Sequence, residues 1–306
     1  MVQECKDQAA SVVQHVDRLL HDGSRLSYAW FEAMHTRVDI VIWDKDISFD
    51  IMHESLQKIC DETSRIENMA SCFINDSETS VLNDSSAGDW VNVSAEFAGI
   101  ISQCIRYSIE TDGLFDAAAS LETSGTPFHM KVEADETASS VRRLQDNVKV
   151  NLSGFLKGYA LDRAVSIVRE YGFRNALVSF GNSSVYALGS HPGGEGWKVS
   201  IADGGKVYDL SDQCLTTSGN CNEERRHIIN PHTGELIAGK GQVSVEALSV
   251  RGVKKPIIRP IFTYPHGFFP PSFSHIDSAP SLRFAHGRAQ AQAHPPYRRA
   301  WGATAV

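Results

Sequence analysis

The segment from Asn151 to Asp162 has the residue types of a phosphate-binding turn. It reads Asn-Leu-Ser-Gly-Phe-Leu-Lys-Gly-Tyr-Ala-Leu-Asp, which predicts a short strand over 148–152, a turn, and a helix with Lys157 in its first turn. The backbone N–H groups and the dipole of a helix N-terminus favour a phosphate group, and Lys157 adds a positive charge. The segment is neither a Walker A loop nor a G-x-G-x-x-G motif. Read alone, it is more typical of an ordinary strand-to-helix turn with a surface lysine.

His227 is the second residue whose position suggests chemistry. It follows the polar run Thr-Thr-Ser-Gly at 216–219 and begins a short segment of extended character over 227–229. A histidine close to hydroxyl groups can act as a base, although a single histidine is more often a hydrogen-bonded structural residue. His227 and His232 are also spaced as a weak candidate for a metal pair on a turn. The residues alone leave all three roles open.

Helices and strands are predicted along most of the chain, which indicates the α+β class. Apolar residues at helical spacing predict helices over 8–21, 51–69 and 155–171, and Ser94 is a candidate N-cap for a further helix. Runs of apolar and β-branched residues predict strands over 38–43, 176–180, 185–188, 197–201 and 242–248. A chain of 306 residues is long enough to give these elements a substantial buried core.

The overall composition is that of a soluble globular protein. Hydrophobic residues make up 42% and charged residues 22% of the chain, and the net charge of −8 argues against a general nucleic-acid binder. The six cysteines form no C-x-x-C pair, which favours reduced thiols. No stretch has the length of a membrane-spanning helix, and no apolar segment before Cys5 resembles a lipoprotein signal. We therefore expect a cytoplasmic protein without a membrane-spanning segment.

The character of the sequence changes near residue 250. Eight of the eleven prolines lie between Pro256 and Pro296. From residue 251 onward there are eight Lys or Arg residues and one acid, Asp277, so that this segment carries +7 whereas residues 1–250 carry −15. The Pro-rich runs suit neither a helix nor a paired strand, and we expect residues 251–306 to be a disordered tail.

Six short blocks of the sequence occur in an order typical of one enzyme family. They are Met-His-Thr-Arg-Val at 34–38, Asp-Ser-Glu-Thr-Ser-Val-Leu-Asn at 76–83, Thr-Asp-Gly-Leu-Phe-Asp at 111–116, Leu-Lys-Gly-Tyr-Ala-Leu-Asp at 156–162, Thr-Ser-Gly at 217–219 and His-Ile-Ile-Asn-Pro-His-Thr-Gly at 227–234. Through these blocks, residues 29–249 resemble the ApbE flavin transferases. Six blocks in the correct order are hard to obtain by chance, although each block is short.

The resemblance implies a fold and a reaction. The family has two α+β halves around a cleft that binds FAD, with a magnesium ion (Mg²⁺) at the pyrophosphate. A Thr or Ser hydroxyl of a target flavoprotein attacks the FMN-side phosphorus, FMN becomes attached to that protein, and AMP leaves. Two alternatives fit the same blocks: an FAD-binding protein without turnover, and an FAD pyrophosphatase in which water replaces the acceptor hydroxyl. Many members of the family are exported lipoproteins.

The family's functional positions can be carried over to matching residues of this chain. His227 matches the catalytic histidine that activates the acceptor hydroxyl, and Gly154 matches a backbone carbonyl that helps to ligate magnesium. Phe73 matches an aromatic position that stacks on the flavin. The positions that match FAD contacts are Met34, Phe73, Phe115, Asp116, Asn151, Lys157 and Ile229.

Several positions depart from the family pattern. Gly181-Asn182 stands where Gly-Gly is usual, and Asn230-Pro231 stands where Asp-Pro is common. After residue 249 the chain lacks the Asp-Ala-x-x-Thr-like helix whose side chains bind magnesium in the family. We therefore expect three regions: a helical extension over 1–28, a flavin transferase domain over 29–250 without its C-terminal element, and the tail. We also expect flavin transfer to be slow or absent.

Overall fold

A computed structural model describes residues 13–181, 183–200, 207–220, 228–237, 241–248 and 283–285. The chain divides into two compact units. The first contains the residues up to Arg65 and those from Ala160 to Gln213, and the second contains Ile66–Tyr159 and Cys214–Arg288. Within the described residues, no helix combines the length and the apolar character needed to cross a membrane.

The first unit is built on an antiparallel sheet in the order β1-β2-β3-β7-β8. Its strands are β1 (Gln14–Leu19), β2 (Arg25–Ala33), β3 (Thr36–Asp44), β7 (Asn175–Phe180) and β8 (Ser184–Leu188). Buried and half-buried side chains alternate along β3 and β7, as expected for strands with one face on the core. The inward side chains include Ile40, Ile42 and Val178, which are fully buried.

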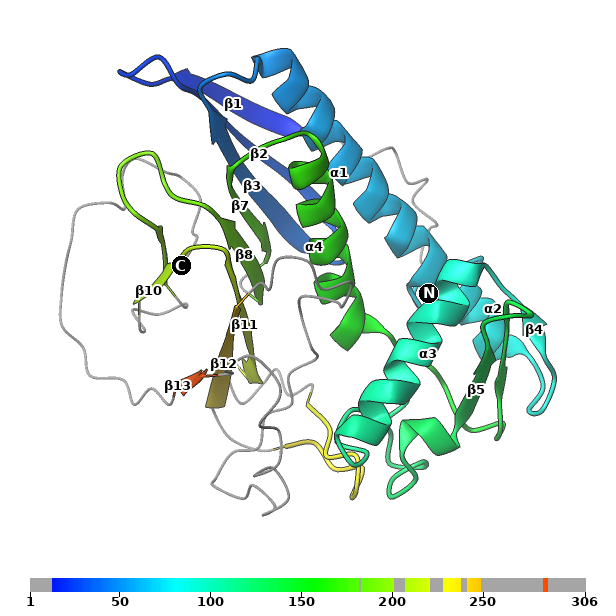
Figure 1. The fold of residues 1–306 in the computed structure, drawn as a ribbon. Helices are drawn as coiled ribbons and strands as arrows, with labels where there is room; N and C mark the ends of the chain where they lie inside the picture. The colour runs from blue at the N-terminus through cyan, green and yellow to red at the C-terminus, as the bar shows by residue number, and fades with distance from the viewer. Residues whose placement is uncertain are drawn as a thin grey trace, which may run out of the picture. The chain divides into compact units, whose positions relative to one another are not determined.

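Two helices pack beside this sheet, as Figure 1 shows. They are the first part of α1 (Phe49–Ala70) and the second part of α4 (Ser153–Glu170). Apolar residues at helical spacing face the core, among them Met52 and Ile59 of α1 and Leu161 of α4. On the outside, Arg163 of α4 donates to Glu62 of α1 at 2.9 Å.

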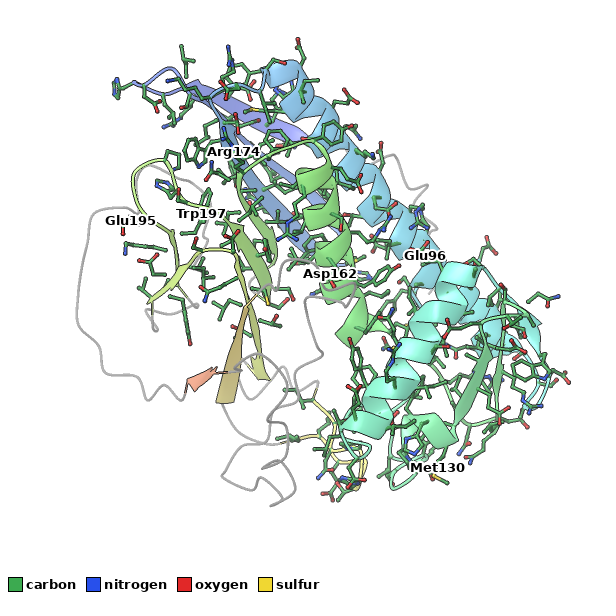
Figure 2. The ribbon with its side chains drawn as sticks, viewed as in Figure 1. Glu96, Met130, Asp162, Arg174, Glu195 and Trp197 are labelled. Atoms are coloured by element: carbon green, nitrogen blue, oxygen red, sulfur yellow. The ribbon has the colours of Figure 1, made fainter. Side chains whose placement is uncertain are left out.

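A small hairpin completes the first unit. It consists of β9 (Trp197–Ser200) and β10 (Val207–Leu210), which pair in antiparallel register. Trp197, labelled in Figure 2, is buried, and its indole N–H donates to the carbonyl of Leu188 at 2.9 Å. This bond joins the hairpin to the end of β8.

The second unit combines helices with two groups of strands. Its helical elements are α2 (Glu78–Asp84), α3 (Ala95–Glu110) and the short 3-10 helix η1 (Phe128–Met130). The strands β4 (Val91–Asn92), β5 (Val132–Asp135) and β6 (Ser140–Arg143) form a sheet in the order β4-β6-β5. The strands β11 (Gln213–Asn220), β12 (Gly241–Leu248) and β13 (Arg283–Ala285) are neighbours in that order.

Most of the predicted elements are present, and the α+β class is confirmed. Ser94 is the N-cap of α3, where its hydroxyl accepts from the N–H of Phe97 at 3.1 Å. α4 ends before Gly172, whose φ of +82° suits a residue that follows a helix C-terminus. The predicted strands over 38–43, 176–180, 185–188, 197–201 and 242–248 correspond to β3, β7, β8, β9 and β12.

Three predictions from the sequence were wrong. The helix expected over 8–21 is strand β1 over Gln14–Leu19 in its described part, where it pairs with β2 in a register that joins Gln14 to Trp30. The helical extension expected over 1–28 thus has strands in its described part, and residues 1–12 lie outside the described residues. The strand expected over 148–152 is an irregular segment. In the region 251–306, Arg283–Ala285 pairs with β12 although no paired strand was expected there, and the remainder of that region lies outside the described residues.

Candidate functional site

The start of α4 is fixed by Asn151 in the second unit. The Asn151 side-chain oxygen accepts from the backbone N–H of Ser153 at 3.0 Å and from its hydroxyl at 2.6 Å. This asparagine thus satisfies one of the N–H groups that a helix start leaves without an intrahelical acceptor. The Asn151 backbone N–H donates in turn to the carbonyl of Ala117 at 2.6 Å. Two blocks that are far apart in the sequence are therefore joined here.

Lys157 lies early in α4 and is half-buried. It makes no hydrogen bond or ion pair with the part of the chain that the structure describes. Burial lowers the pKa of Lys157, because removal from water disfavours the ammonium form. A bound anion would offset that effect. Lys157 and the helix start together have the chemistry of a phosphate site.

The loop after α3 holds Phe115 in a defined position. The Thr111 hydroxyl donates to the carbonyl of Tyr107 at 2.6 Å and accepts from the N–H of Phe115 at 2.9 Å. Phe115 is buried, and its ring meets that of Tyr107 edge-on at 6.0 Å. Gly113 turns the chain with φ +79°, where a Cβ atom would lie 2.9 Å from Cβ of Pro127. Glycine is therefore required for this turn.

Asp116 forms a buried ion pair with Lys131. The carboxylate accepts from Lys131 Nζ at 2.7 Å, and the two side chains are 1% and 0% exposed. The other carboxylate oxygen accepts from the N–H of Ala118 at 2.8 Å. Lys131 Nζ also donates to the hydroxyl of Thr123 at 3.0 Å. The sequence suggested Asp116 as an FAD contact, and in the structure its carboxylate holds the loop over 115–118 in place.

Asn83 ties α2 to the segment that precedes α4. Its side-chain amide donates to the carbonyl of Val150 at 2.8 Å, and its side-chain oxygen accepts from the N–H of Val150 at 2.7 Å. Nearby, the buried Arg143 donates to the carbonyls of Leu82 and Val148 at 2.9 and 2.7 Å. Side chains thus supply hydrogen bonds to the backbone of the irregular segment over 148–152, whereas the backbone of a strand is bonded to a neighbouring strand.

The turn that follows His227 packs on the loop over 120–125 of the same unit. Ile229 and Leu236 form an isolated antiparallel bridge, and the N–H of Gly125 donates to the carbonyl of Pro231 at 3.0 Å. Gly234 has φ +72°, and a Cβ atom there would lie 2.5 Å from the Cα atom of Leu121. His227 itself lies outside the described residues.

Phe73 lies in a loop of the second unit that hydroxyl groups hold in shape. The Ser77 hydroxyl donates to the carbonyl of Ser71 at 2.6 Å and accepts from the N–H of Ser80, which caps α2. Phe73 is 63% exposed.

Met34 belongs to the first unit and occupies a strained turn. Met34 and His35 connect β2 to β3 with φ values of 52° and 56°, the conformation that a two-residue hairpin normally assigns to Asn-Gly. Met34 is nevertheless buried, at 8% exposure. The turn after β7 lies beside the start of β3, since the N–H of Gly181 donates to the carbonyl of Arg37 at 2.9 Å. Strain of this kind is characteristic of functional segments.

The structure thus links several of the predicted residues within the second unit. Backbone bonds connect the loop carrying Phe115 and Asp116 to the start of α4, and the turn carrying Ile229 packs against the loop over 120–125. Lys131 and the role of Asn83 were not predicted from the sequence. A lysine fifteen positions after an aspartate gives no local signal, because the loop and η1 bring the two together.

Replacing Asn83 with alanine is expected to reduce the free energy of unfolding by about 1–3 kcal/mol, because two hydrogen bonds to Val150 are lost. The amide of Val150 should also exchange its hydrogen faster. Asn147→Ala is the matched control, since the exposed Asn147 makes one long bond of 3.5 Å to Glu122. Urea denaturation and hydrogen exchange measure both effects. Equal stability of the two variants would contradict this role for Asn83.

Comparison with known proteins identifies the family. Residues 34–252 match the model of the ApbE family, and this stretch includes every block discussed above. The chain therefore belongs to the ApbE family. The match begins at the strained Met34 turn and extends beyond β12.

Curated relatives carry one functional name. An FAD:protein FMN transferase from Chlamydia muridarum is 23% identical over 209 residues, which cover 59% of this chain and 65% of the relative. An FAD:protein FMN transferase from Rhodobacter capsulatus is 27% identical over 201 residues, covering 54% and 38%. The chain thus spans less than two thirds of the length of these relatives.

Solved structures have the same fold. An ApbE protein from Thermotoga maritima superimposes with a TM-score of 0.62 at 23% identity, covering 76% of this chain and 82% of that protein. The flavin transferase ApbE from Vibrio cholerae gives a TM-score of 0.59 at 17% identity, covering 78% and 82%. These likenesses confirm the ApbE-type α+β fold.

Proposed function

We propose that this chain is an FAD:protein FMN transferase. FMN would be transferred from FAD to a Thr or Ser of a target flavoprotein through a phosphoester, with release of AMP. The observation that carries this proposal is the half-buried Lys157 beside the capped start of α4, within a chain that matches the ApbE family. The name shared by the curated relatives supports the same activity.

The described residues suggest how FAD would be held. Lys157 and the backbone N–H groups of α4 would bind the pyrophosphate, and the exposed Phe73 would stack on the flavin ring. Asp116 would act through Lys131, by fixing the loop that carries Phe115. Residues Met34, Asn151 and Ile229 would complete the cofactor contacts that the family resemblance implies.

A magnesium ion would neutralise the pyrophosphate, as the resemblance implies. Apart from its chain neighbours and the backbone of its own helix, no described atom lies within 4 Å of a Cβ built at Gly154, and the Gly154 carbonyl lies in the first turn of α4. The one group of three or more His, Cys, Asp or Glu residues that could hold a metal among the described residues lies elsewhere, on β1 and α1. Magnesium is normally bound with carboxylate and phosphate oxygens. The Gly154 carbonyl would supply one oxygen ligand, so the described residues around Gly154 fit magnesium only in part.

The chemical step would be an in-line displacement at phosphorus. The acceptor hydroxyl oxygen would form a bond to the FMN-side phosphorus while the bond to the bridging oxygen breaks and AMP departs. His227 would take the proton of the attacking hydroxyl. With water in place of the hydroxyl, the products would be free FMN and AMP, which is the pyrophosphatase alternative. An FAD-binding protein without turnover would release no AMP.

Lys157→Gln is expected to weaken FAD binding about tenfold or more and to leave riboflavin binding unchanged, because riboflavin has no phosphate for Lys157 to contact. Quenching of flavin fluorescence measures both affinities, and FAD should bind more tightly than FMN or NAD. Lys198→Gln is the control, since Lys198 is exposed on β9. If Lys157→Gln changed both affinities equally, or neither, the phosphate site would be misplaced. Absence of FAD binding by the unaltered chain would refute the proposed function.

A further inference from the structure

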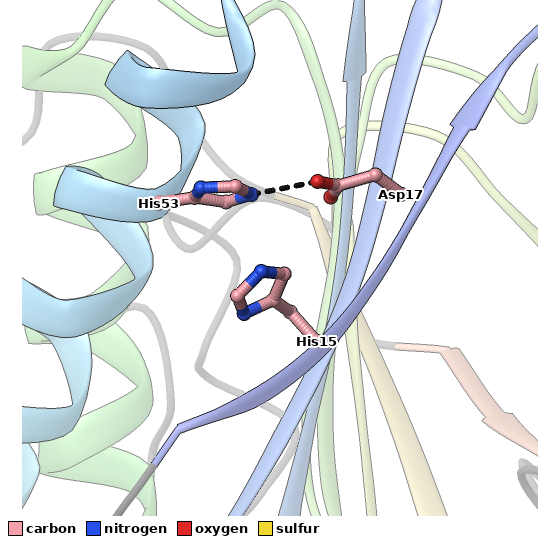
Figure 3. Close-up of side chains that lie close together, drawn as sticks. All are labelled: His15, Asp17 and His53. Carbon is pink, nitrogen blue, oxygen red and sulfur yellow. Dashed lines mark hydrogen bonds and ion pairs between the residues drawn. The ribbon is translucent and has the colours of Figure 1, made fainter.

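Three side chains with metal-binding atoms meet in the first unit, apart from the positions discussed above. They are His15 and Asp17 of β1 and His53 of α1. Each offers one ligand atom, and these three atoms all lie within 4.8 Å of one another. Figure 3 shows the two histidine rings and the carboxylate turned toward a common point between the strand and the helix.

The backbone places these side chains together. His15 and Asp17 are two residues apart on a strand, so they project from the same face. The register of β1 on β2 pairs His15 with Ala29 and Asp17 with Ser27. His53 faces them from the first turns of α1, where its Nε2 lies 2.8 Å from Oδ2 of Asp17. The ring centroids of His15 and His53 are 4.1 Å apart.

A buried hydroxyl orients the carboxylate. Ser27 is fully buried, and its hydroxyl donates to Oδ1 of Asp17 at 2.8 Å. This bond leaves Oδ2 directed at His53. A second group that holds a ligating carboxylate or imidazole is characteristic of metal sites, since it fixes the ligand before the ion arrives. An accidental surface pair of histidine and aspartate does not require such a second group to orient the carboxylate.

The ligand types select a class of ion. Two imidazole nitrogens and one carboxylate oxygen suit zinc and related first-row divalent ions, whereas magnesium and calcium prefer oxygen ligands. Zinc lies about 2.0–2.2 Å from such atoms, which places the ligands of a tetrahedral site roughly 3.3–3.5 Å apart. Small side-chain rotations bring the three atoms to that spacing, because all three side chains are at the surface or partly exposed. Water would occupy the remaining position.

We propose that His15, Asp17 and His53 form a binding site for one zinc ion that joins β1 to α1. Both histidines bind as neutral imidazoles, so that the hydrogen bond between His53 and Asp17 is replaced by two bonds to the ion. The ion binds the folded chain preferentially and stabilises the pairing of β1 at the edge of the sheet. This site is independent of flavin binding.

The test uses the full chain after treatment with EDTA and dialysis. Calorimetric titration with zinc chloride is expected to give one tight site, and the melting temperature should rise with zinc. His15→Ala and His53→Ala should each weaken this site about tenfold or more, and Ser27→Ala should weaken it about 10–100-fold. His21→Ala, at an exposed histidine in the turn between β1 and β2, should leave it unchanged. Magnesium at millimolar concentration should not displace the zinc.

Further measurements separate this site from other histidines of the chain. Cobalt chloride in place of zinc should give visible absorption bands that disappear in both His15→Ala and His53→Ala. His15→Gln and His53→Gln repeat the comparison with side chains closer in size, and circular dichroism verifies that each variant is folded. Two results would contradict the zinc site: equal zinc binding by these variants and the unaltered chain, or no zinc binding by the unaltered chain. In either case His53 and Asp17 would form only an ion pair, with the ring of His15 beside it.

Discussion

Replacing Lys131 with methionine is expected to lower the free energy of unfolding by about 3–5 kcal/mol. The substitution keeps most of the side-chain volume but leaves the carboxylate of Asp116, which is 1% exposed, without its charged partner. Thr123 and the carbonyl of Ala118 lose a donor at the same time. An unpaired buried charge costs far more than a lost surface contact. Urea denaturation followed by circular dichroism measures the change.

Two comparisons isolate the buried pair. Lys149→Met removes a lysine that is 61% exposed and should change the stability by less than about 0.5 kcal/mol. The double variant Lys131→Met with Asp116→Asn should recover part of the loss, because the uncompensated charge is removed as well. A single Lys131→Met variant as stable as Lys149→Met would mean that Asp116 obtains solvent or another partner.

His227→Ala is expected to reduce FMN transfer about 10²–10⁴-fold while FAD affinity changes only a few-fold, because a general base acts mainly in the transition state. This prediction rests on the proposed function and on the matching position of His227. His232→Ala is the matched control, since His232 is an exposed histidine on the turn that follows. Release of AMP in the presence of an acceptor protein measures the rate. Full activity of His227→Ala would assign this histidine a structural role.

The sequence predicted the elements whose signals are local. α1 and α4 follow from apolar residues at helical spacing, and α3 follows from the capping hydroxyl of Ser94. No helix was predicted over Glu78–Asp84, the segment of α2, because Asn, Asp and Ser dominate around it. The structure nevertheless has Ser77 capping this short helix. The capping residue Ser77 was therefore present in the sequence, but the Asn, Asp and Ser residues around it favoured a loop.

Features that depend on distant partners could not be predicted. β1 was predicted as a helix because the apolar residues over 8–21 are at helical spacing, and only its pairing with β2 makes it a strand. The Asp116–Lys131 pair and the cluster of His15, Asp17 and His53 come from separate elements. The candidate site residues were predicted from the six family blocks. The hydrogen bonds that connect the backbones of these blocks are visible only in the structure.

The most direct test of the proposed function is the intact mass of an acceptor protein after incubation with this chain, FAD and magnesium. The acceptor is the protein substrate of one of the FAD:protein FMN transferases named above. We expect its mass to increase by one FMN group, slowly in view of the departures after residue 249, with one AMP released for each group attached. The increase should be absent with His227→Ala. Release of AMP with no gain in acceptor mass would contradict transfer and indicate a pyrophosphatase, and absence of both would indicate FAD binding without turnover.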